Sequence, residues 1–300
     1  MVVPSDRIAD LRGHLLKDAP LAEYTSWQVG GPADYLYKPA DLEDLSCFLS
    51  QLPASIPILW LGLGSNVLIR DAGISGVVIV TQGALRGISS MKQDLIRAEA
   101  GISCAQFARY TARQGLTGAE FMAGIPGTIG GALAMNAGCY GGETWQCVHS
   151  VEIMNRAGVR VIRKASEFEV AYRHVGRPCD EWFVAGYFSL QAGDKAKALI
   201  DIKALLEKRN AAQPTGLPNC GSVFRNPPGE YAARLIEKCE LKGFTIGGAS
   251  VSEKHANFII NTGHATAQDI ETLVFTVQSI VEQRQSVRLI PEVCILGRHN

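Results

Sequence analysis

The chain has 300 residues, 47% of them hydrophobic, so it can bury a sizeable core and has room for two or three domains. Its 29 Lys and Arg balance 29 Asp and Glu, which argues against nucleic acid or an anionic membrane as a partner. The eight Cys and six His show no CxxC or HExxH spacing, so we expect reduced thiols and no metal site.

The first twenty residues are charged throughout and contain no apolar stretch of the kind that a signal peptide needs. We therefore expect a cytoplasmic protein. The first regular elements follow the turn Gly30-Gly31-Pro32. Tyr35–Tyr37 is predicted to be a strand, and Asp41 caps a helix whose apolar residues recur at helical spacing, namely Leu42, Leu45, Phe48, Leu49 and Leu52.

The next stretch places a glycine loop between two apolar strands. Ile58–Leu61 and Val67–Ile69 are the predicted strands, and Gly62-Leu63-Gly64-Ser65-Asn66 is the loop. The sixth position of a dinucleotide fingerprint would be Val67 instead of glycine, and no Gly-Lys-Ser/Thr follows, so neither a Rossmann site nor a P-loop fits. A nucleotide site and a plain β-turn both remain open.

The middle of the chain is predicted to be rich in short strands. Gly76–Val80, Leu95–Ala100 and Phe183–Leu190 are apolar strands, and Val148–Met154 with Val159–Ile162 form a hairpin. A capping box, Ser103 with Gln106, starts a helix over 104–114 that Gly115 ends. Short strands with few helices favour an α+β lobe over a doubly wound sheet.

The most distinctive stretch is 121–142, FMAGIPGTIGGALAMNAGCYGG, with seven glycines and no charge. Pro126, Asn136 and the glycines make a poor membrane helix, and no positive flank marks one side. Ordering so many glycines is entropically unfavourable, so something must compensate. Either the stretch is a tightly packed turn, or its bare backbone N–H groups face a phosphate-bearing ligand.

The composition changes after a charged helix over 197–209. The segment AAQPTGLPNCGSVFRNPPG is typical of a domain boundary or a functional loop. An amphipathic helix over 231–239 follows, and Thr266 with Asp269 caps another with one apolar face. A last strand, Val287–Leu296, is interrupted at Pro291-Glu292, which indicates an edge or a bend.

Three polar residues stand in unusual settings: Arg173 after EVAY, Ser222 in a glycine turn, and Glu292 at the strand break. Each also has an ordinary interpretation as a surface charge or a cap. A serine hydrolase fits poorly, because Cys220 and Phe224 stand where the elbow G-x-S-x-G needs glycines. A serine without a base of its own is better suited to proton donation.

Seven motifs together resemble the bacterial UDP-N-acetylenolpyruvoylglucosamine reductase family, flavoenzymes of peptidoglycan precursor synthesis. In chain order they are TSWQVGGPADYL, LGLGSNVLI, AGIPGTIGGALAMNAGCYGGE, YR at Tyr172-Arg173, NCGSVFRNP, KHANFIINTG and RLIPEV. The resemblance spans 25–297.

The resemblance implies an α+β fold with a two-lobed FAD-binding domain of the vanillyl-alcohol-oxidase (PCMH) type over 1–203, its lobes about 1–80 and 81–203. A C-terminal α+β substrate-binding domain would follow over 204–300. The implied activity is reduction of UDP-N-acetyl-3-O-(1-carboxyvinyl)-glucosamine to UDP-N-acetylmuramate, with tightly bound FAD and with NADPH as reductant.

The resemblance also assigns residues. Ser222 would protonate the carbon alpha to the carboxylate, and Arg173 and Glu292 would stabilise the enol intermediate. Developing negative charge there calls for a positioned cation. Arg225 and Asn226 would face the UDP-sugar substrate. Backbone N–H groups would hold the FAD pyrophosphate, and these belong to Gly62, Gly64, Ser65, Asn66, Gly127 and Thr128. Lys254, His255 and Asn257 receive no role beyond packing or loop order.

Some positions depart from the family pattern. Cys220 replaces a common alanine, and His174-Val175 replaces a polar pair ending in serine. The short span between Arg173 and Ser222 indicates the shorter subclass, which lacks an extra tyrosine-bearing loop. A monomer is expected. Two alternatives stay open at this point: an FAD-dependent oxidase of the same fold acting on an alcohol or sugar, and a nucleotide-sugar-binding protein without chemistry.

Overall fold

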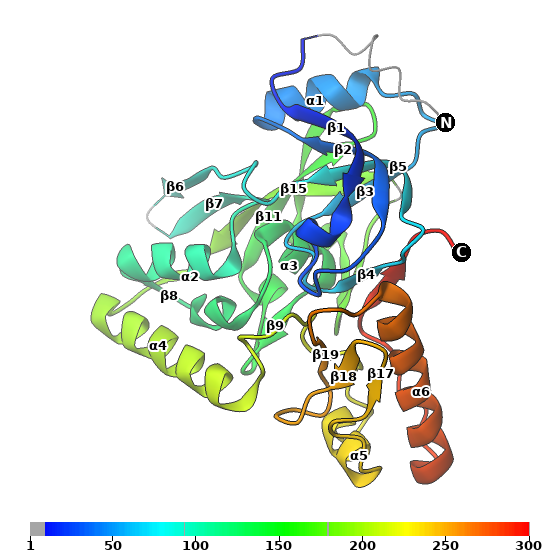
Figure 1. Cartoon of the computed structure of the whole chain (residues 1–300). Helices are drawn as coiled ribbons and strands as arrows, with labels where there is room; N and C mark the ends of the chain where they lie inside the picture. The colour runs from blue at the N-terminus through cyan, green and yellow to red at the C-terminus, as the bar shows by residue number, and fades with distance from the viewer. Residues whose placement is uncertain (1–9, 93, 179, 300) are drawn as a thin grey trace. The chain divides into compact units, whose positions relative to one another are not determined.

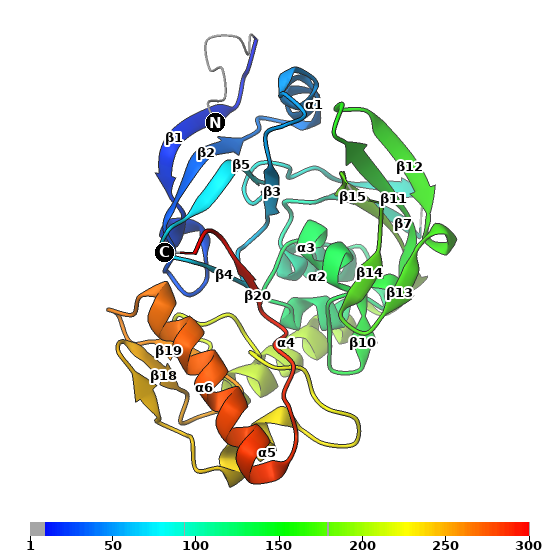
Figure 2. The same ribbon diagram turned by 90° about the vertical axis from the view of Figure 1, so that its right-hand side faces the viewer.

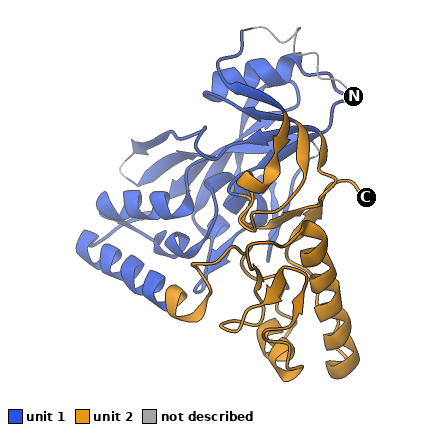
Figure 3. Ribbon diagram, in the orientation of Figure 1, with its two compact units in different colours: residues 1–17, 35–63, 76–208 blue, residues 18–34, 64–75, 209–300 orange. Residues whose placement is uncertain are grey.

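The computed structural model describes residues 10–92, 94–178 and 180–299, and the chain forms two compact units (Figure 3). Unit 1 comprises residues 1–17, 35–63 and 76–208, and unit 2 comprises residues 18–34, 64–75 and 209–300. Each unit is therefore discontinuous in sequence. The domain boundary expected between 203 and 204 stays a prediction.

Unit 1 contains a five-stranded antiparallel sheet of order β12-β11-β15-β7-β6 (Figure 2). The expected hairpin is confirmed, since β11 pairs with β12 and the Asn155 carboxamide accepts from the amides of Ala157 and Val159, each at 3.0 Å. The strands are β6 (Ile88–Lys92), β7 (Leu95–Glu99), β11 (Val148–Asn155), β12 (Arg160–Lys164) and β15 (Glu181–Ser189).

Helices pack against this sheet around the first core of unit 1. The predicted capping box of α2 is confirmed, and Phe107 of that helix packs on Phe188 of β15 with ring centroids 4.5 Å apart. α3 lies against β15 and β7. The helices are α2 (Cys104–Arg113), α3 (Ile129–Met135) and α4 (Lys195–Ala212) (Figure 1).

A second core in unit 1 lies under α1 (Leu42–Gln51), where Tyr37 stacks on Phe48 at 3.9 Å. Asp41 caps α1 as expected, accepting from Asp44 N at 2.9 Å. The associated sheet has the order β1-β2-β5-β3, with β3 parallel to β5. Its strands are β1 (His14–Pro20), β2 (Pro32–Lys38), β3 (Ile58–Leu61) and β5 (Ile74–Val80).

The remaining elements of unit 1 are short pairs and single turns that connect the sheet to the helices. They are β8 (Leu116–Thr117) with β16 (Gln191–Ala192), β9 (Gly138–Cys139) with β10 (Gly142–Glu143), β13 (Glu169–Ala171) with β14 (His174–Gly176), and the 3₁₀ turns Glu120–Gly124, Thr144–Gln146 and Ala165–Glu167.

Unit 2 has its own core, beneath the long helix α6 (Ala267–Gln285). The predicted capping box of Thr266 and Asp269 is confirmed, and the apolar face is buried, with Ile270, Leu273, Val274, Val277 and Val281. The other elements are the 3₁₀ turn Leu21–Tyr24, α5 (Ala232–Lys238), and a sheet of β17 (Thr245–Ile246), β18 (Ala249–Val251) and β19 (Ile259–Asn261). Across the described residues, every helix is too short or too polar to cross a bilayer.

The final strand is shorter than predicted. Only Cys294–Leu296 is a strand (β20), and it pairs in parallel with β4 (Val67–Ile69). The expectation of a strand from Val287 was wrong, because Pro291 has no N–H to continue a ladder and makes only an isolated bridge with Phe224. The predicted bend at Pro291-Glu292 is therefore the place where pairing changes partner.

A buried carboxylate closes the second core of unit 1. Asp44 is 2% exposed and accepts hydrogen bonds from Tyr37 Oη at 2.5 Å, Ala40 N at 2.8 Å and Arg12 N at 2.7 Å. Burial by itself raises the pKa of Asp44, but these hydrogen bonds outweigh it and hold the pKa below its ordinary value.

We expect Asp44→Asn to lower the free energy of unfolding by about 2 kcal/mol at pH 7, because buried donors lose a charged acceptor. Because the pKa of Asp44 is lower in the folded than in the unfolded protein, its carboxylate stabilises the folded state fully above the unfolded-state pKa of about 3.9. This stabilisation is lost as the pH falls through the folded-state pKa. Denaturant titrations should therefore show a flatter acid limb in the variant. Glu43→Gln, which breaks only an exposed pair with Arg160, serves as the control; equal losses in both variants would contradict the assignment.

Candidate functional site

The loop between β3 and β4 leaves its backbone N–H groups without acceptors among the described residues, although the carbonyls of Gly64 and Asn66 do accept hydrogen bonds. None of the five backbone N–H groups from Gly62 to Asn66 donates a hydrogen bond to any residue that the structure describes. Gly64 has a φ of +67°, and a Cβ there would lie 2.0 Å from the carbonyl oxygen of Tyr24, so only glycine fits. Successive free amides suit an anion such as a diphosphate.

In unit 1 this loop meets the glycine stretch. A Cβ on Gly62 would lie 2.4 Å from Thr128 Oγ1, and Thr128 caps α3 by accepting from Gly131 N at 3.5 Å. The amide of Gly127 differs, because it already donates to Ile125 O at 3.0 Å. Of the amides expected to bind FAD, that of Gly127 therefore already has a hydrogen-bond acceptor within the protein.

A pocket of about 120 Å³ opens beside these residues in unit 1. Trp60 and Trp182 stack at its edge with centroids 5.3 Å apart, and Trp60 Nε1 is buried without a hydrogen-bond partner among the described residues. Apolar side chains and the glycines Gly62, Gly130 and Gly131 make up most of its lining, together with Thr81 and Arg177. Bare glycine backbone, an aromatic wall and an unsatisfied donor suit one part of a dinucleotide cofactor, since the pocket is too small to hold the whole molecule.

Arg173 sits in unit 1 at the turn between β13 and β14, with a φ of +55° that is uncommon for a non-glycine residue. Its Nη2 donates to Gly138 O at 3.0 Å, and its guanidinium lies 4.9 Å from the centroid of the Tyr172 ring. The side chain is thus held by the glycine stretch. Left-handed backbone at a polar residue is a feature of functional turns.

In unit 2 the structure brings the Ser222 segment and Glu292 together. Glu292 N donates to Val223 O at 2.7 Å, and Arg225 N donates to Ile290 O at 2.9 Å. The two segments therefore run antiparallel around the Phe224–Pro291 bridge. The hydroxyl of Ser222 makes no hydrogen bond within the described chain, so its proton is available to a ligand.

Asn257 holds the serine segment in place, a role that the sequence did not reveal. It is 3% exposed, its Oδ1 accepts from Phe224 N at 3.0 Å, and its Nδ2 donates to Phe224 O at 2.8 Å. Its carbonyl also accepts from Val223 N at 2.9 Å. The motif KHANFIINTG marked this residue as unusual, but its partner lies 33 positions away in sequence.

The two expected substrate residues have different surroundings. Arg225 Nε is buried and has no hydrogen-bond partner in the described part of the chain. Such a donor is suited to an anionic ligand. Asn226 Oδ1 instead accepts from Ala232 N at 3.1 Å at the start of α5, so its side chain has a structural task. Asn66 Nδ2 donates to Glu292 O at 3.1 Å and fixes the main chain of that residue.

Cys220 lies two residues before Ser222 and is 4% exposed. Burial, together with the negative charge of Glu292, raises the pKa of its thiol well above the ordinary value. The thiol therefore stays neutral, and no catalytic role as a nucleophile follows for it. Arg173 lies in unit 1, whereas Ser222 and Glu292 lie in unit 2, so the convergence of all three stays a prediction.

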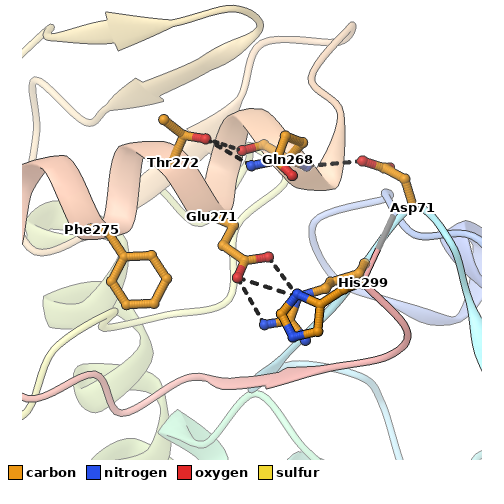
Figure 4. A pocket seen from close by; sticks show the side chains of 7 residues that line it. Asp71, Gln268, Glu271, Thr272, Phe275 and His299 are labelled. Carbon is orange, nitrogen blue, oxygen red and sulfur yellow. Dashed lines mark hydrogen bonds and ion pairs between the residues drawn. The ribbon is translucent and has the colours of Figure 1, made fainter.

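A further pocket of about 200 Å³ lies in unit 2 against α6 (Figure 4). Its polar groups serve the fold: Arg70 forms a two-pronged ion pair with Glu271, with Arg70 Nη2 2.9 Å from Glu271 Oε1, and Asp71 accepts from Ala267 N at 3.0 Å and Gln268 N at 2.9 Å. Of the residues singled out from the sequence, none lines it.

Two family models match separate parts of the chain. A family model described as the C-terminal domain of UDP-N-acetylenolpyruvoylglucosamine reductase matches residues 213–296, and one described as an FAD binding domain matches residues 33–163. The reductase of Legionella pneumophila (strain Lens) is 58% identical over 299 residues, 99% of this chain and 97% of the relative.

More distant relatives agree. The reductase of Methylococcus capsulatus (strain Bath) is 56% identical, covering 96% of this chain and 95% of its own. The crystal structure of the reductase from Thermus caldophilus matches with a TM-score of 0.80 at 30% identity, covering 95% of this chain and 99% of that one. The expected α+β fold, an FAD-binding domain with a reductase C-terminal domain, is confirmed.

We expect Gly62→Ala to weaken FAD binding about tenfold, because the new Cβ displaces Thr128 Oγ1 and disturbs a cap of about 1 kcal/mol. Equilibrium titration of the apoprotein, followed by flavin fluorescence, measures this. Gly216→Ala is the matched control, since its Cβ would meet nothing within 4 Å. An unchanged FAD affinity in Gly62→Ala would remove this loop from the cofactor site.

Proposed function

The chain belongs to the UDP-N-acetylenolpyruvoylglucosamine reductase family, and from this premise we propose that it reduces UDP-N-acetyl-3-O-(1-carboxyvinyl)-glucosamine to UDP-N-acetylmuramate for peptidoglycan precursor synthesis. It is an FAD-dependent oxidoreductase with NADPH as the reductant. The family, enzyme class and cofactors expected from the motifs are confirmed. The single observation that best supports the site is the pairing of the Ser222 segment with Glu292.

For the cofactor, we propose that the free amides of Gly62, Gly64, Ser65 and Asn66 donate to the diphosphate of FAD. Bound FAD would supply the hydride that adds to the beta carbon of the enolpyruvyl double bond. Thr128 lines the same loop through its contact with Gly62. The amide of Gly127 would contribute only as a shared donor, because it already serves Ile125 O.

For the proton, we propose Ser222 as the donor. Hydride addition leaves a pair of electrons delocalised toward the substrate carboxylate, as an enolate. Ser222 Oγ gives its proton to the alpha carbon, which completes the saturated product, and the oxygen is reprotonated from solvent. Its lack of any hydrogen bond to the described residues favours this role, since a committed hydroxyl proton would first have to be released.

For the intermediate, we propose that Arg173 and Glu292 together stabilise the enolate, with the guanidinium of Arg173 offsetting the charge that develops on the carboxylate. Asn257 and Asn66 support the Ser222 and Glu292 backbones, respectively. The unpaired Nε of Arg225 would donate to an anionic group of the UDP-sugar, with Asn226 beside it. A monomeric state, a cytoplasmic location and the shorter subclass remain predictions, the first testable by light scattering.

We expect Ser222→Ala to bind FAD normally and to be bleached by NADPH at the wild-type rate, while turnover with the enolpyruvyl substrate falls about 10²- to 10⁴-fold, the usual contribution of a proton donor. Stopped-flow absorbance at the flavin band separates the two half-reactions. Ser50→Ala, which removes an exposed hydroxyl bonded only to its own helix, is the control. Full turnover in Ser222→Ala would exclude the serine as donor.

A test of the substrate uses the wild-type protein. NADPH oxidation should depend on the enolpyruvyl substrate and yield UDP-N-acetylmuramate one for one. Oxygen consumption with an alcohol or sugar, and without NADPH, would instead identify an oxidase. Binding of a UDP-sugar without any NADPH oxidation would identify a binding protein.

A further inference from the structure

Asn136 stands at a helix end whose backbone conformation is one that glycine adopts most readily. It ends α3 in the left-handed conformation, with φ of +41° and ψ of +51°, and its backbone N–H donates to Ala132 O. Glycine adopts this conformation without steric strain, and seven glycines lie within the same stretch. What asparagine adds to glycine at this position is a carboxamide that can form hydrogen bonds.

The carboxamide of Asn136 is 1% exposed and fully used. Its Oδ1 accepts from Trp145 N at 3.1 Å. Its Nδ2 donates to Glu143 Oε2 at 2.9 Å and to Ala171 O at 3.2 Å. One buried side chain thus ties the end of α3 to three later segments, which are β10, the 3₁₀ turn after it, and the last residue of β13.

The bond to Ala171 matters because the turn carrying Arg173 begins immediately after β13. Arg173 returns the contact, since its Nη2 donates to Gly138 O at 3.0 Å, two residues beyond Asn136. Each segment therefore gives one side-chain donor to a carbonyl of the other. These two reciprocal bonds lie at the turn of the β13–β14 hairpin, and they fix both the position of the turn and the direction of the guanidinium.

We propose that Asn136 is a positioning residue for Arg173, acting through the carbonyl of Ala171 to set where the guanidinium lies during reduction of the enolpyruvyl group. The proposal rests on the role assigned to Arg173 under the proposed function. Asn136 does not touch substrate in this scheme. Its effect should therefore fall on the step that needs Arg173 and not on the reduction of FAD by NADPH.

The first experiment uses Asn136→Gly in the FAD-loaded protein, which keeps the left-handed helix end and removes only the carboxamide. We expect oxidation of the reduced flavin by the enolpyruvyl substrate to slow about 10- to 100-fold, because a misplaced group costs up to 10²-fold. Flavin content and the rate of bleaching by NADPH should change little, whereas the melting temperature should fall because Trp145 N and Ala171 O lose a buried partner. Ser286→Gly is the matched control, since this exposed residue ends α6 with a φ of +56°.

The second experiment separates positioning from a general structural effect. If Asn136 acts through Arg173, the double variant Asn136→Gly/Arg173→Ala should be no slower than Arg173→Ala alone. Multiplied losses in the double variant would overturn the inference while leaving the role of Arg173 intact. A wild-type rate in Arg173→Ala would overturn that role, and this inference with it.

A swapped pair covers the case in which Asn136→Gly loses flavin or fails to fold. Asn136→Asp/Glu143→Gln keeps the net charge and lets residue 143 donate to residue 136, so that the bridge between them survives. The donor to Ala171 O is lost, and a carboxylate oxygen that repels this carbonyl takes its place. We expect the same 10- to 100-fold slowing of flavin oxidation; a wild-type rate in this variant would overturn the inference.

Discussion

The structure depends on a run of backbone N–H groups that have no hydrogen-bond acceptor among the described residues. From Gly62 to Asn66 five amides in a row have no acceptor among the described residues, although unpaired backbone polar groups are rare in folded proteins. Gly64 can occupy its position only because it has no Cβ. In the proposed site the diphosphate of FAD would accept from these amides, and the bound cofactor would then stabilise the loop.

Three segments near the proposed catalytic residues are fixed by hydrogen bonds from the side chains of asparagines elsewhere in the chain. Asn66 fixes the carbonyl of Glu292, Asn136 the carbonyl of Ala171, and Asn257 the peptide of Phe224. A carboxamide has both a donor and an acceptor. It can therefore form the hydrogen bonds that a neighbouring strand would otherwise provide to the backbone. Each of the three proposed catalytic residues is thereby held through its own or a neighbouring backbone group.

This arrangement explains why glycines and asparagines cluster in the motifs. Glycine permits close approach and positive φ, but it cannot anchor anything. Asparagine tolerates the left-handed region and still supplies hydrogen bonds. The stretch from 121 to 142 uses both, with Gly138 accepting from Arg173 and Asn136 donating to Ala171. The stretch is therefore a packed turn that also anchors the Arg173 hairpin, and the interpretation that its amides face a phosphate stays a prediction.

Local physics in the sequence determined the elements whose signals lie within a few residues. The strands Ile58–Leu61 and Val67–Ile69, the capped start of α1 and the capping boxes of α2 and α6 follow from apolar spacing and side-chain caps, and the structure confirms them. The motifs also fixed the family and its cofactor. Tertiary structure alone decided that residues 18–34 and 64–75 join the C-terminal unit, and that Pro291 bridges Phe224 instead of extending a strand. It alone gave Asn257 and Asn136 their tasks, because a buried carboxamide acquires its partners only when distant main chain arrives beside it.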